Sequence, residues 1–206
     1  AAAGCYGFGM AHPLDRPVYH ALRGGWAPHA RREGDALRLD PDFGPFAALD
    51  DAGADPSALI ALAHLGAPIW LVECGPVAPP RGLALVRTAE LAQMVLETPA
   101  LAGPHARGKP LGEADAADMA ALAHLTEPGP WARLTHRNGG FVGVRNARGE
   151  LVAMAGERMH LAGFAEVSGV CTHPDARGQG LAFALMAQVV AAMIERGNRP
   201  FLHSYA

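Results

Sequence analysis

Residues 164–182 read FAEVSGVCTHPDARGQGLA and are followed by a long apolar run. The first part carries bulky and β-branched side chains and ends at Pro174, which has no N–H for a strand ladder, so it predicts a strand. The apolar run predicts a helix that begins near Gly178 to Gly180 and ends near Gly197, because glycine is common just past a helix end. The stretch therefore predicts a strand, a glycine-rich loop and a helix.

The start of this helix is a candidate anion site. Residues 177–182 contain no Ser, Thr, Asp or Asn that can satisfy the free N–H groups of a helix start. Two glycines, the cationic Arg177 and the positive end of the helix dipole favour a phosphate or pyrophosphate there. Alternatively, water or the side chain of Asp175 caps an ordinary helix, and the residues alone leave both interpretations open.

Two familiar phosphate motifs are excluded by their spacing. A Walker loop requires lysine followed by Ser or Thr, and the only lysine in the sequence is Lys109, which precedes a proline. A Rossmann fingerprint requires a third glycine or alanine where this sequence has Phe183, and an acidic residue at the end of a following strand. The nearest acidic residue, Glu195, is expected at the end of the helix instead. Nucleotide binding of these two kinds is not expected.

The run Arg177-Gly178-Gln179-Gly180-Leu181-Ala182 fits the pattern Q/R-x-x-G-x-G/A, and residues 110–206 resemble the GNAT N-acetyltransferase superfamily. In that superfamily the pattern forms the loop that holds the pyrophosphate of acyl-CoA. The resemblance implies that these six residues bind acetyl-CoA and that the main chain of Val170, Cys171 and Thr172 contacts its pantetheine arm. It also implies an α/β fold with a mixed, mostly antiparallel central sheet flanked by helices.

The same resemblance implies transfer of acetyl from acetyl-CoA to a primary amine by direct attack in a ternary complex. An alkylamine has a pKa near ~10, so a base or the local surroundings must remove its proton before attack. Glu166 is the candidate catalytic base, because it lies in an otherwise apolar strand close to the loop. The alternative is that Glu166 is a carboxylate on the solvent side of the strand. Glu157 on the preceding strand is the next candidate.

Gly169 in mid-strand predicts a bulge or a close backbone approach, since glycine weakens a strand. By resemblance, its main chain lies beside the pantetheine arm and the thioester oxygen. Cys171 is expected to be a small buried residue rather than a nucleophile, because no adjacent group lowers the pKa of its thiol. His173 and His203 are expected to be a loop residue and a strand residue rather than catalytic groups.

The end of the sequence departs from the family pattern. GNAT domains usually continue with a helix whose tyrosine acts as general acid and with a further strand, whereas this sequence ends at Ser204-Tyr205-Ala206. No general acid is therefore assigned. Either the sequence is cut short of the natural protein, or the last elements come from elsewhere, such as a partner subunit, which leaves a homodimer open. Two alternative functions follow: a non-catalytic acyl-CoA-binding module and a GNAT-fold interaction scaffold.

Composition sets further limits. Half of the residues are apolar, which predicts a globular protein. The net charge is −3 and the basic residues are scattered, so no basic patch for binding nucleic acid or an anionic membrane is expected. Three distant cysteines and no C-x-x-C motif indicate neither a disulfide framework nor a metal site. A cytoplasmic location is expected, because the first residues lack a secretory pattern. The expected acceptor is a small-molecule or peptide amine that the sequence does not identify.

The order of elements predicts two parts joined by a linker. Residues 10–98 are expected to form an α/β region, and one interpretation of this region is a degenerate GNAT-like half. Residues 99–110 are expected to form a linker rich in Pro and Gly, and residues 111–206 are expected to form the GNAT domain. The first part is expected to contain helices at 14–23 and 56–65, strands at 45–51 and 67–74, a loop at 27–45 and an ambiguous segment at 82–97. The second part is expected to contain a helix ending at Leu125 with Met119, Leu122 and Leu125 on one face, a short helix at 128–137, and two strands within 141–159.

Overall fold

The computed structural model describes residues 12–50, 54–66, 68–75, 77–97 and 108–205. It divides into two compact units. The first comprises Ala1–Met94, Met159–Ala162 and His203–Ala206, and the second comprises Val95–Arg158 and Gly163–Leu202. Among the described residues, no helix is both long enough and apolar enough to cross a membrane.

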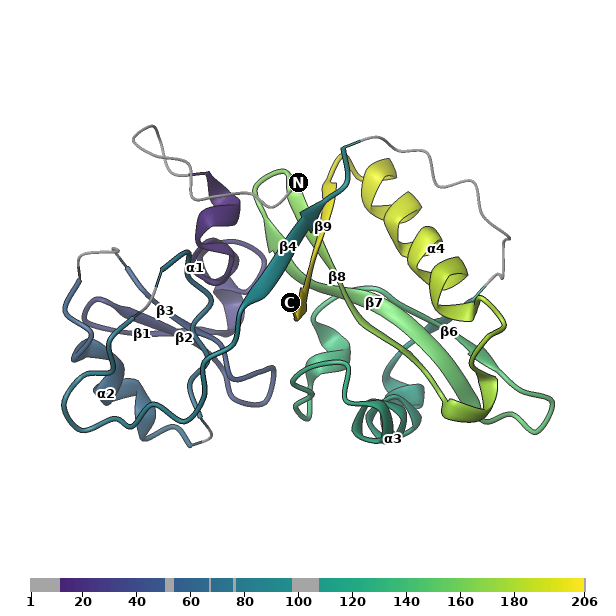
Figure 1. Cartoon of the computed structure of the whole chain (residues 1–206), viewed down its shortest axis with the longest axis horizontal. Helices are drawn as coiled ribbons and strands as arrows, with labels where there is room; N and C mark the ends of the chain where they lie inside the picture. Colours follow the sequence, from purple (N-terminus) through teal and green to yellow (C-terminus); the bar gives the residue numbers. More distant parts are fainter. Residues whose placement is uncertain (1–11, 51–53, 67, 76, 98–107, 206) are drawn as a thin grey trace. The chain divides into compact units, whose positions relative to one another are not determined.

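A six-stranded sheet contains the strands of the part predicted to be the GNAT domain, together with one strand from the predicted first part and one that begins in the predicted linker (Figure 1). Its strand order is β4-β9-β8-β7-β6-β5. The strands are β4 (Leu91–Val95), β5 (Lys109–Leu111), β6 (Phe141–Arg145), β7 (Leu151–Leu161), β8 (Phe164–Thr172) and β9 (Arg199–Tyr205). β5 and β6 pair antiparallel, as do β6 and β7, whereas β8 and β9 pair parallel. The predicted mixed, mostly antiparallel sheet is confirmed.

The stretch quoted above forms the predicted strand, loop and helix, and a further strand follows. β8 leads through the glycine-rich loop into α4 (Leu181–Glu195), and Gly197 follows the helix with φ +77° before β9 begins. The helix makes the crossover that two parallel strands require. The register of β8 with β9 runs from Phe164 opposite Arg199 to Glu166 opposite Phe201. The second half of β8 therefore lies beyond this ladder.

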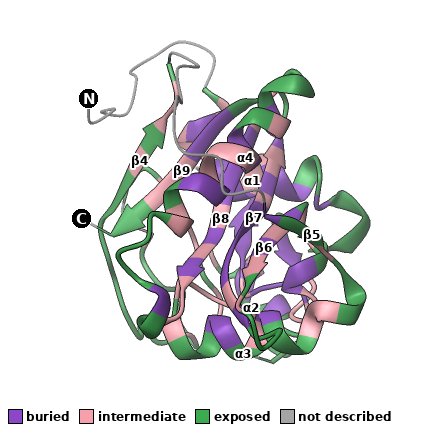
Figure 2. Ribbon diagram, turned by 90° about the vertical axis from the view of Figure 1, so that its right-hand side faces the viewer, coloured by how far each residue is buried: buried purple, intermediate pink, exposed green. Residues whose placement is uncertain are grey.

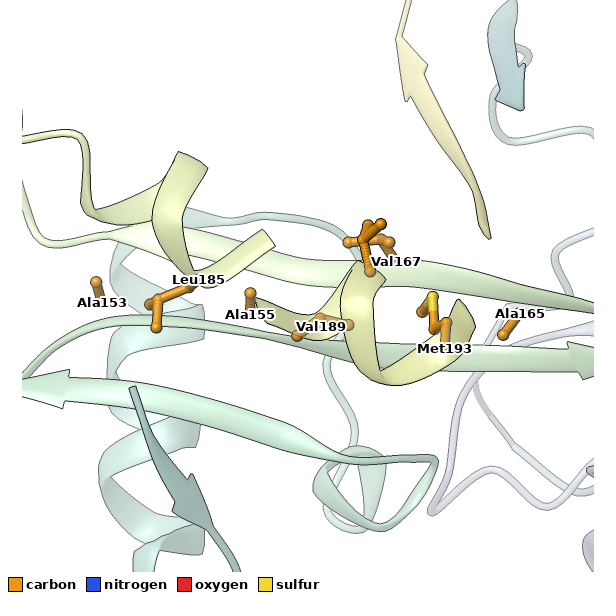
Figure 3. Packing of buried hydrophobic residues seen from close by; sticks show 8 residues of the cluster. Ala153, Ala155, Ala165, Val167, Leu185, Val189 and Met193 are labelled. Atoms are coloured by element: carbon orange, nitrogen blue, oxygen red, sulfur yellow. The ribbon is translucent and has the colours of Figure 1, made fainter. Parts of the chain in front are cut away.

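α4 packs on one face of the sheet through alternating strand residues (Figure 3). Small side chains on β7 and β8, including Ala153, Ala155 and Ala165, lie beneath the larger side chains of the helix. The helix contributes Leu185, Val189, Val190 and Met193, all buried. Small residues below large ones let the helix approach the sheet closely, which is the packing that a dense core requires.

α3 (Ala116–Thr126) covers the opposite face of the same sheet (Figure 1). Met119 and Leu122 of α3 pack with Met154 of β7. The residues on either side of Met154 in the strand face α4 instead, because successive side chains of a strand point to opposite faces of the sheet. Figure 2 shows β7 and β8 largely buried, because helices cover both faces.

Two predictions for this region are wrong. Leu125 is 55% exposed rather than on the buried face, and only a 3-10 turn, Thr135–Arg137, forms where a second helix was expected, since Pro128 and Pro130 interrupt the segment.

The first unit contains a separate three-stranded antiparallel sheet in the order β1-β2-β3. Its elements are α1 (Pro17–Arg23), β1 (Ala30–Glu33), β2 (Ala36–Leu39), β3 (Ala47–Leu49) and α2 (Ala58–Ala63). The two helices and β3 agree with the predictions. The loop predicted at 27–45 is wrong, because the polar run ARRE forms an exposed strand that turns at Gly34. The strand predicted at 67–74 is also wrong, since within its described residues only Trp70 forms a bridge, to Phe46.

The segment between the predicted halves is described in part. Residues 98–107 lie outside the described residues, so the predicted linker at 99–110 and the domain limits drawn from it stay predictions. Its last residues begin β5, and the ambiguous segment at 82–97 contains the strand β4. Gly108 donates a hydrogen bond to the Gln188 side chain at 2.9 Å and accepts one from it at 3.0 Å. This pair ties the start of β5 to α4.

Arg38 is a buried charge that supports the fold of the first unit. Its guanidinium donates hydrogen bonds to the carbonyl oxygens of Leu62 and Gly66, both at 2.5 Å. These carbonyls lie at the end of α2, where helix carbonyls lack partners and cations are favoured. Arg38→Met, which keeps length but not donors, is expected to lower the free energy of unfolding by about 2–4 kcal/mol.

Chemical denaturation followed by circular dichroism measures this effect. Arg32→Met is the matched control, because Arg32 is exposed and its ion pair with Asp50 is at the surface. Equal losses in the two variants would contradict the role assigned to Arg38.

Candidate active site

The loop after β8 is shaped by its own hydrogen bonds and by two glycines. A 3-10 turn at Pro174–Ala176 follows the strand, and the ring nitrogen Nδ1 of His173 accepts a hydrogen bond from the main-chain N–H of Asp175 at 3.2 Å. Gly178 and Gly180 then take φ values of +78° and +72°. Residues with a side chain rarely adopt this left-handed conformation, so glycine is favoured at both positions.

The first turn of α4 has no side-chain cap. Gly180 is the N-cap residue, and the first helical hydrogen bond runs from the N–H of Ala184 to the carbonyl of Gly180 at 3.1 Å. The N–H groups of residues 181–183 precede that bond and stay outside the helical ladder. The side chain of Asp175 is 92% exposed and does not cap the helix, so the alternative that it caps an ordinary helix start is wrong.

The space around this helix start is open. A Cβ built on Gly178 or on Gly180 meets no described atom within 4 Å. The neighbouring Arg177 is exposed, and its Nε donates to the carbonyl oxygen of Thr172 at 3.4 Å. The buried hydroxyl oxygen of Thr172 has no hydrogen-bond partner among the described residues. Open N–H groups, a cation and an unsatisfied hydroxyl beside one another fit a phosphate-bearing ligand.

Cys171 lies at the end of β8 and faces the core beneath α3. Burial raises the pKa of its thiol, and a hydrogen bond with the Thr126 side chain opposes that shift without reversing it. A thiol that stays protonated is a poor nucleophile. The buried position agrees with the expectation from the sequence.

A small cavity lies against the middle of β8, on the face of the sheet that α3 covers. Its volume is about 10 Å³, which is room for about one water molecule. Prolines and aromatic rings form one side, and polar residues of β7 and β8 form the other. The lining residues are Pro128, Gly129, Pro130, Trp131, Thr135, Phe141, Glu157, Arg158, Ser168 and Gly169.

Gly169 is the point where aromatic rings reach the strand. Its φ of +61° breaks the regular strand geometry, and a Cβ built there lies 2.8 Å from the Phe141 ring and 3.4 Å from the Trp131 ring. A Cβ on Gly156 lies 2.4 Å from the Phe141 ring. The two glycines therefore let the Phe141 ring lie directly on the sheet.

The segment that carries Trp131 is fastened by Glu113. Its carboxylate accepts two hydrogen bonds from Arg137, at 2.9 and 2.7 Å, and contacts Nε2 of the buried His136 at 3.1 Å. Hydrogen bonds from Arg137 and then from His136 lower the pKa of Glu113 to about 2. The carboxylate thus stays charged at all physiological pH values, and the cavity wall that ends at Thr135 is anchored beside α3.

The two candidate bases have different surroundings. Glu166 is fully buried, and both its oxygens accept hydrogen bonds from Arg158, at 2.7 and 2.8 Å. It does not line the cavity. Glu157 does line it, is 2% exposed, and accepts a hydrogen bond from Arg196 at 2.5 Å through Oε1. Of the two candidates, Glu157, the second candidate from the sequence, is therefore the one that lines the cavity, and its carboxylate is paired with Arg196 at the end of α4.

Comparison with known proteins decides the family. The FR47-like protein family matches residues 141–206. Over almost its whole length the chain is similar to a crystal structure from Novosphingobium aromaticivorans whose name places it in the GNAT family of acetyltransferases. The two are 49% identical, the match covers 95% of this chain and 87% of that one, and the TM-score is 0.84. This chain belongs to the GNAT acetyltransferase family.

A more distant structure also shares the fold. A GCN5-related N-acetyltransferase from Kribbella flavida is 18% identical, with 94% of this chain and 87% of that one covered and a TM-score of 0.57. Rv2747 from Mycobacterium tuberculosis, solved with CoA and NLQ, is 13% identical over 46% of this chain and 61% of that one, with a TM-score of 0.41. No curated protein matches the sequence.

In this GNAT protein the predicted donor-binding residues are contiguous in space. Residues 170–172 end β8, and residues 177–182 form the loop and the first turn of α4 directly after it. Glu166 lies at the other end of β8, inside its ion pair with Arg158. Among the described residues, no group of three His, Cys, Asp or Glu side chains is arranged to hold a metal ion.

Sequence reasoning missed the aromatic wall of the cavity. Trp131 and Phe141 lie ten residues apart, in a segment predicted to be a helix and in a strand. The pattern that indicates them is the pair of glycines, Gly156 and Gly169, in two strands that are adjacent in the sheet. Glycines at such positions leave room for a ring from elsewhere in the chain.

Proposed function

We propose that this GNAT protein is an acyl-CoA-dependent N-acyltransferase that transfers acetyl from acetyl-CoA to a primary amine by direct attack in a ternary complex. The observation that carries the proposal is the uncapped start of α4, where two left-handed glycines face open space directly after β8. Such a site binds the pyrophosphate of a donor through main-chain N–H groups and the helix dipole.

The donor is proposed to lie along the end of β8. Its pyrophosphate takes the N–H groups at the start of α4, with Arg177 as a further partner. Its pantetheine arm runs beside the main chain of residues 170–172, which lie beyond the register with β9. The thioester is then near Gly169, next to the cavity.

The reaction needs one base and no covalent intermediate. The amine arrives as an ammonium ion, and the proposed base Glu157 accepts one proton, directly or through the single water that the cavity can hold. The nitrogen lone pair attacks the thioester carbon, the C–S bond breaks, and the CoA thiolate takes the second proton lost by the nitrogen. The products are an N-acetylamine and CoA thiol.

Ligand-dependent thermal stability tests the donor half of this proposal. Saturating acetyl-CoA and plain CoA are expected to raise the melting temperature, because a ligand that binds only the folded state stabilises it. No rise with either ligand would favour the interaction scaffold. A rise without amine-dependent thiol release would favour the non-catalytic acyl-CoA-binding module.

Arg177 contributes one charge-assisted contact to the donor in this proposal. Arg177→Ala is expected to weaken binding of CoA and of every acyl-CoA by about 10- to 100-fold, corresponding to roughly 1.5–3 kcal/mol. Isothermal titration calorimetry measures the dissociation constants. Arg31→Ala, which removes an exposed arginine from the first unit, is the control, and equal affinities in the two variants would contradict the contact.

A further inference from the structure

We propose that Trp131 and Phe141 restrict the acceptor to amines carried on an unbranched carbon, R–CH2–NH2. This inference rests on the proposed function and names the class of substrate for the same site. It predicts acetylation of linear alkylamines and of the side-chain amine of lysine. It also predicts exclusion of amines whose carbon carries a second substituent.

The two rings make a rigid wall where the amine must arrive. Their centroids are 5.5 Å apart with the planes at 73°, an edge-to-face arrangement that is favourable for aromatic pairs. Phe141 is buried among the core residues under α3, and Trp131 packs against the same cluster. Both rings occupy the space that a Cβ of residue 169 would need, beside the place proposed for the thioester.

The size of the cavity limits what can stand next to the thioester. Room for about one water molecule is also room for one amine nitrogen, which is similar in size. The carbon that follows the nitrogen must pass between the rings and the strand. A methylene group is the thinnest carbon, whereas a second substituent on it collides with Trp131 or Phe141.

The charged residues of the cavity lining are both paired. Glu157 accepts a hydrogen bond from Arg196. The charge of Arg158 is compensated by its two hydrogen bonds to Glu166. Aromatic rings in the lining attract an ammonium group through cation–π interaction. With Arg158 bonded to Glu166, the described lining holds no other cationic side chain for a carboxylate on the carbon that bears the amine, which also disfavours α-amino groups of amino acids.

A pair of isomeric amines tests the inference. With acetyl-CoA fixed at saturation, kcat/KM is measured for n-butylamine and for sec-butylamine, which differ only in branching at the reacting carbon. The wild-type protein is expected to prefer n-butylamine by about 10- to 200-fold in kcat/KM, which is the discrimination that one carbon atom typically produces in a tight pocket. Trp131→Ala is expected to bring the ratio below about 5-fold by raising kcat/KM for sec-butylamine.

Trp131→Leu is the second variant in case the alanine variant folds poorly, and Trp70→Ala in the first unit is the matched control, expected to keep the wild-type ratio. The melting-temperature rise with acetyl-CoA shows that each variant is folded and binds the donor. Equal kcat/KM values for the two amines in the wild-type protein would overturn the inference and leave the proposed function standing. A preference that persists in both Trp131 variants would overturn it as well. Acetylation of neither amine, with acetyl-CoA still bound, would overturn both the inference and the proposed transfer.

Discussion

Gly180→Val is expected to weaken acyl-CoA binding by at least about 100-fold while the protein still folds. A Cβ at this position meets no described protein atom, so the substitution causes no internal collision. The branched side chain would instead occupy the open space in front of the N–H groups of α4, where the pyrophosphate is proposed to bind. Two lost charge-assisted hydrogen bonds correspond to roughly 3–6 kcal/mol.

The same substitution also strains the main chain, and a matched control separates the two effects. Gly197 has φ +77°, lies just past the other end of α4, and also faces open space. Gly180→Val and Gly197→Val are each expected to cost about 1–2 kcal/mol of folding stability. Only the former is expected to lose acyl-CoA binding, measured by calorimetry. Unchanged affinity in a folded Gly180→Val protein would remove the basis for the donor site.

Glu157→Gln is expected to lower turnover by about 10²- to 10⁴-fold, the usual effect of removing a general base. Glutamine keeps the size and hydrogen-bonding capacity of the side chain but does not accept the proton. The dissociation constant of acetyl-CoA is expected to stay unchanged. Residual activity of the variant is expected to rise as the pH approaches the amine pKa of ~10, because the free amine then needs no base.

Two control variants distinguish a base from a structural carboxylate. Arg196→Met removes the ion pair of Glu157 but keeps its carboxylate, so turnover is expected to fall far less than in Glu157→Gln. Glu166→Gln leaves the partly buried Arg158 without its partner charge and is expected to cost about 3–5 kcal/mol of stability. If Glu166→Gln instead keeps its stability and loses turnover while Glu157→Gln is active, the base is Glu166 and the assignment of Glu157 is wrong.

The sequence from 164 to 205 allowed a close prediction of local structure. Pro174, Gly178, Gly180 and Gly197 each have a conformation that few residues can replace, so they fix the ends of β8, α4 and β9. Gly180 also matches a known loop pattern together with Arg177 and Ala182, which is why the fold and the family could be predicted. Local constraints of this kind act between neighbours in sequence.

The parts that the sequence did not predict depend on distant contacts. The polar run ARRE forms β1 because it pairs with the buried β2, and the apolar run around Trp70 makes only a bridge to Phe46. The choice between the two carboxylates likewise depends on residues elsewhere in the chain. Glu166 is paired with Arg158, whereas Glu157 lines a cavity that other segments complete. Alternation along a strand shows that neighbouring residues differ in face, but not which face holds the site.

Product analysis with a linear amine tests the central claim most directly. The wild-type protein is incubated with acetyl-CoA and n-butylamine, and free thiol and N-acetylbutylamine are quantified in the same samples. The account predicts that both form in equal amounts, over many turnovers, and that Gly180→Val forms neither at the same donor concentration. Thiol release without N-acetylbutylamine, or no amine-dependent release although acetyl-CoA raises the melting temperature, would contradict it.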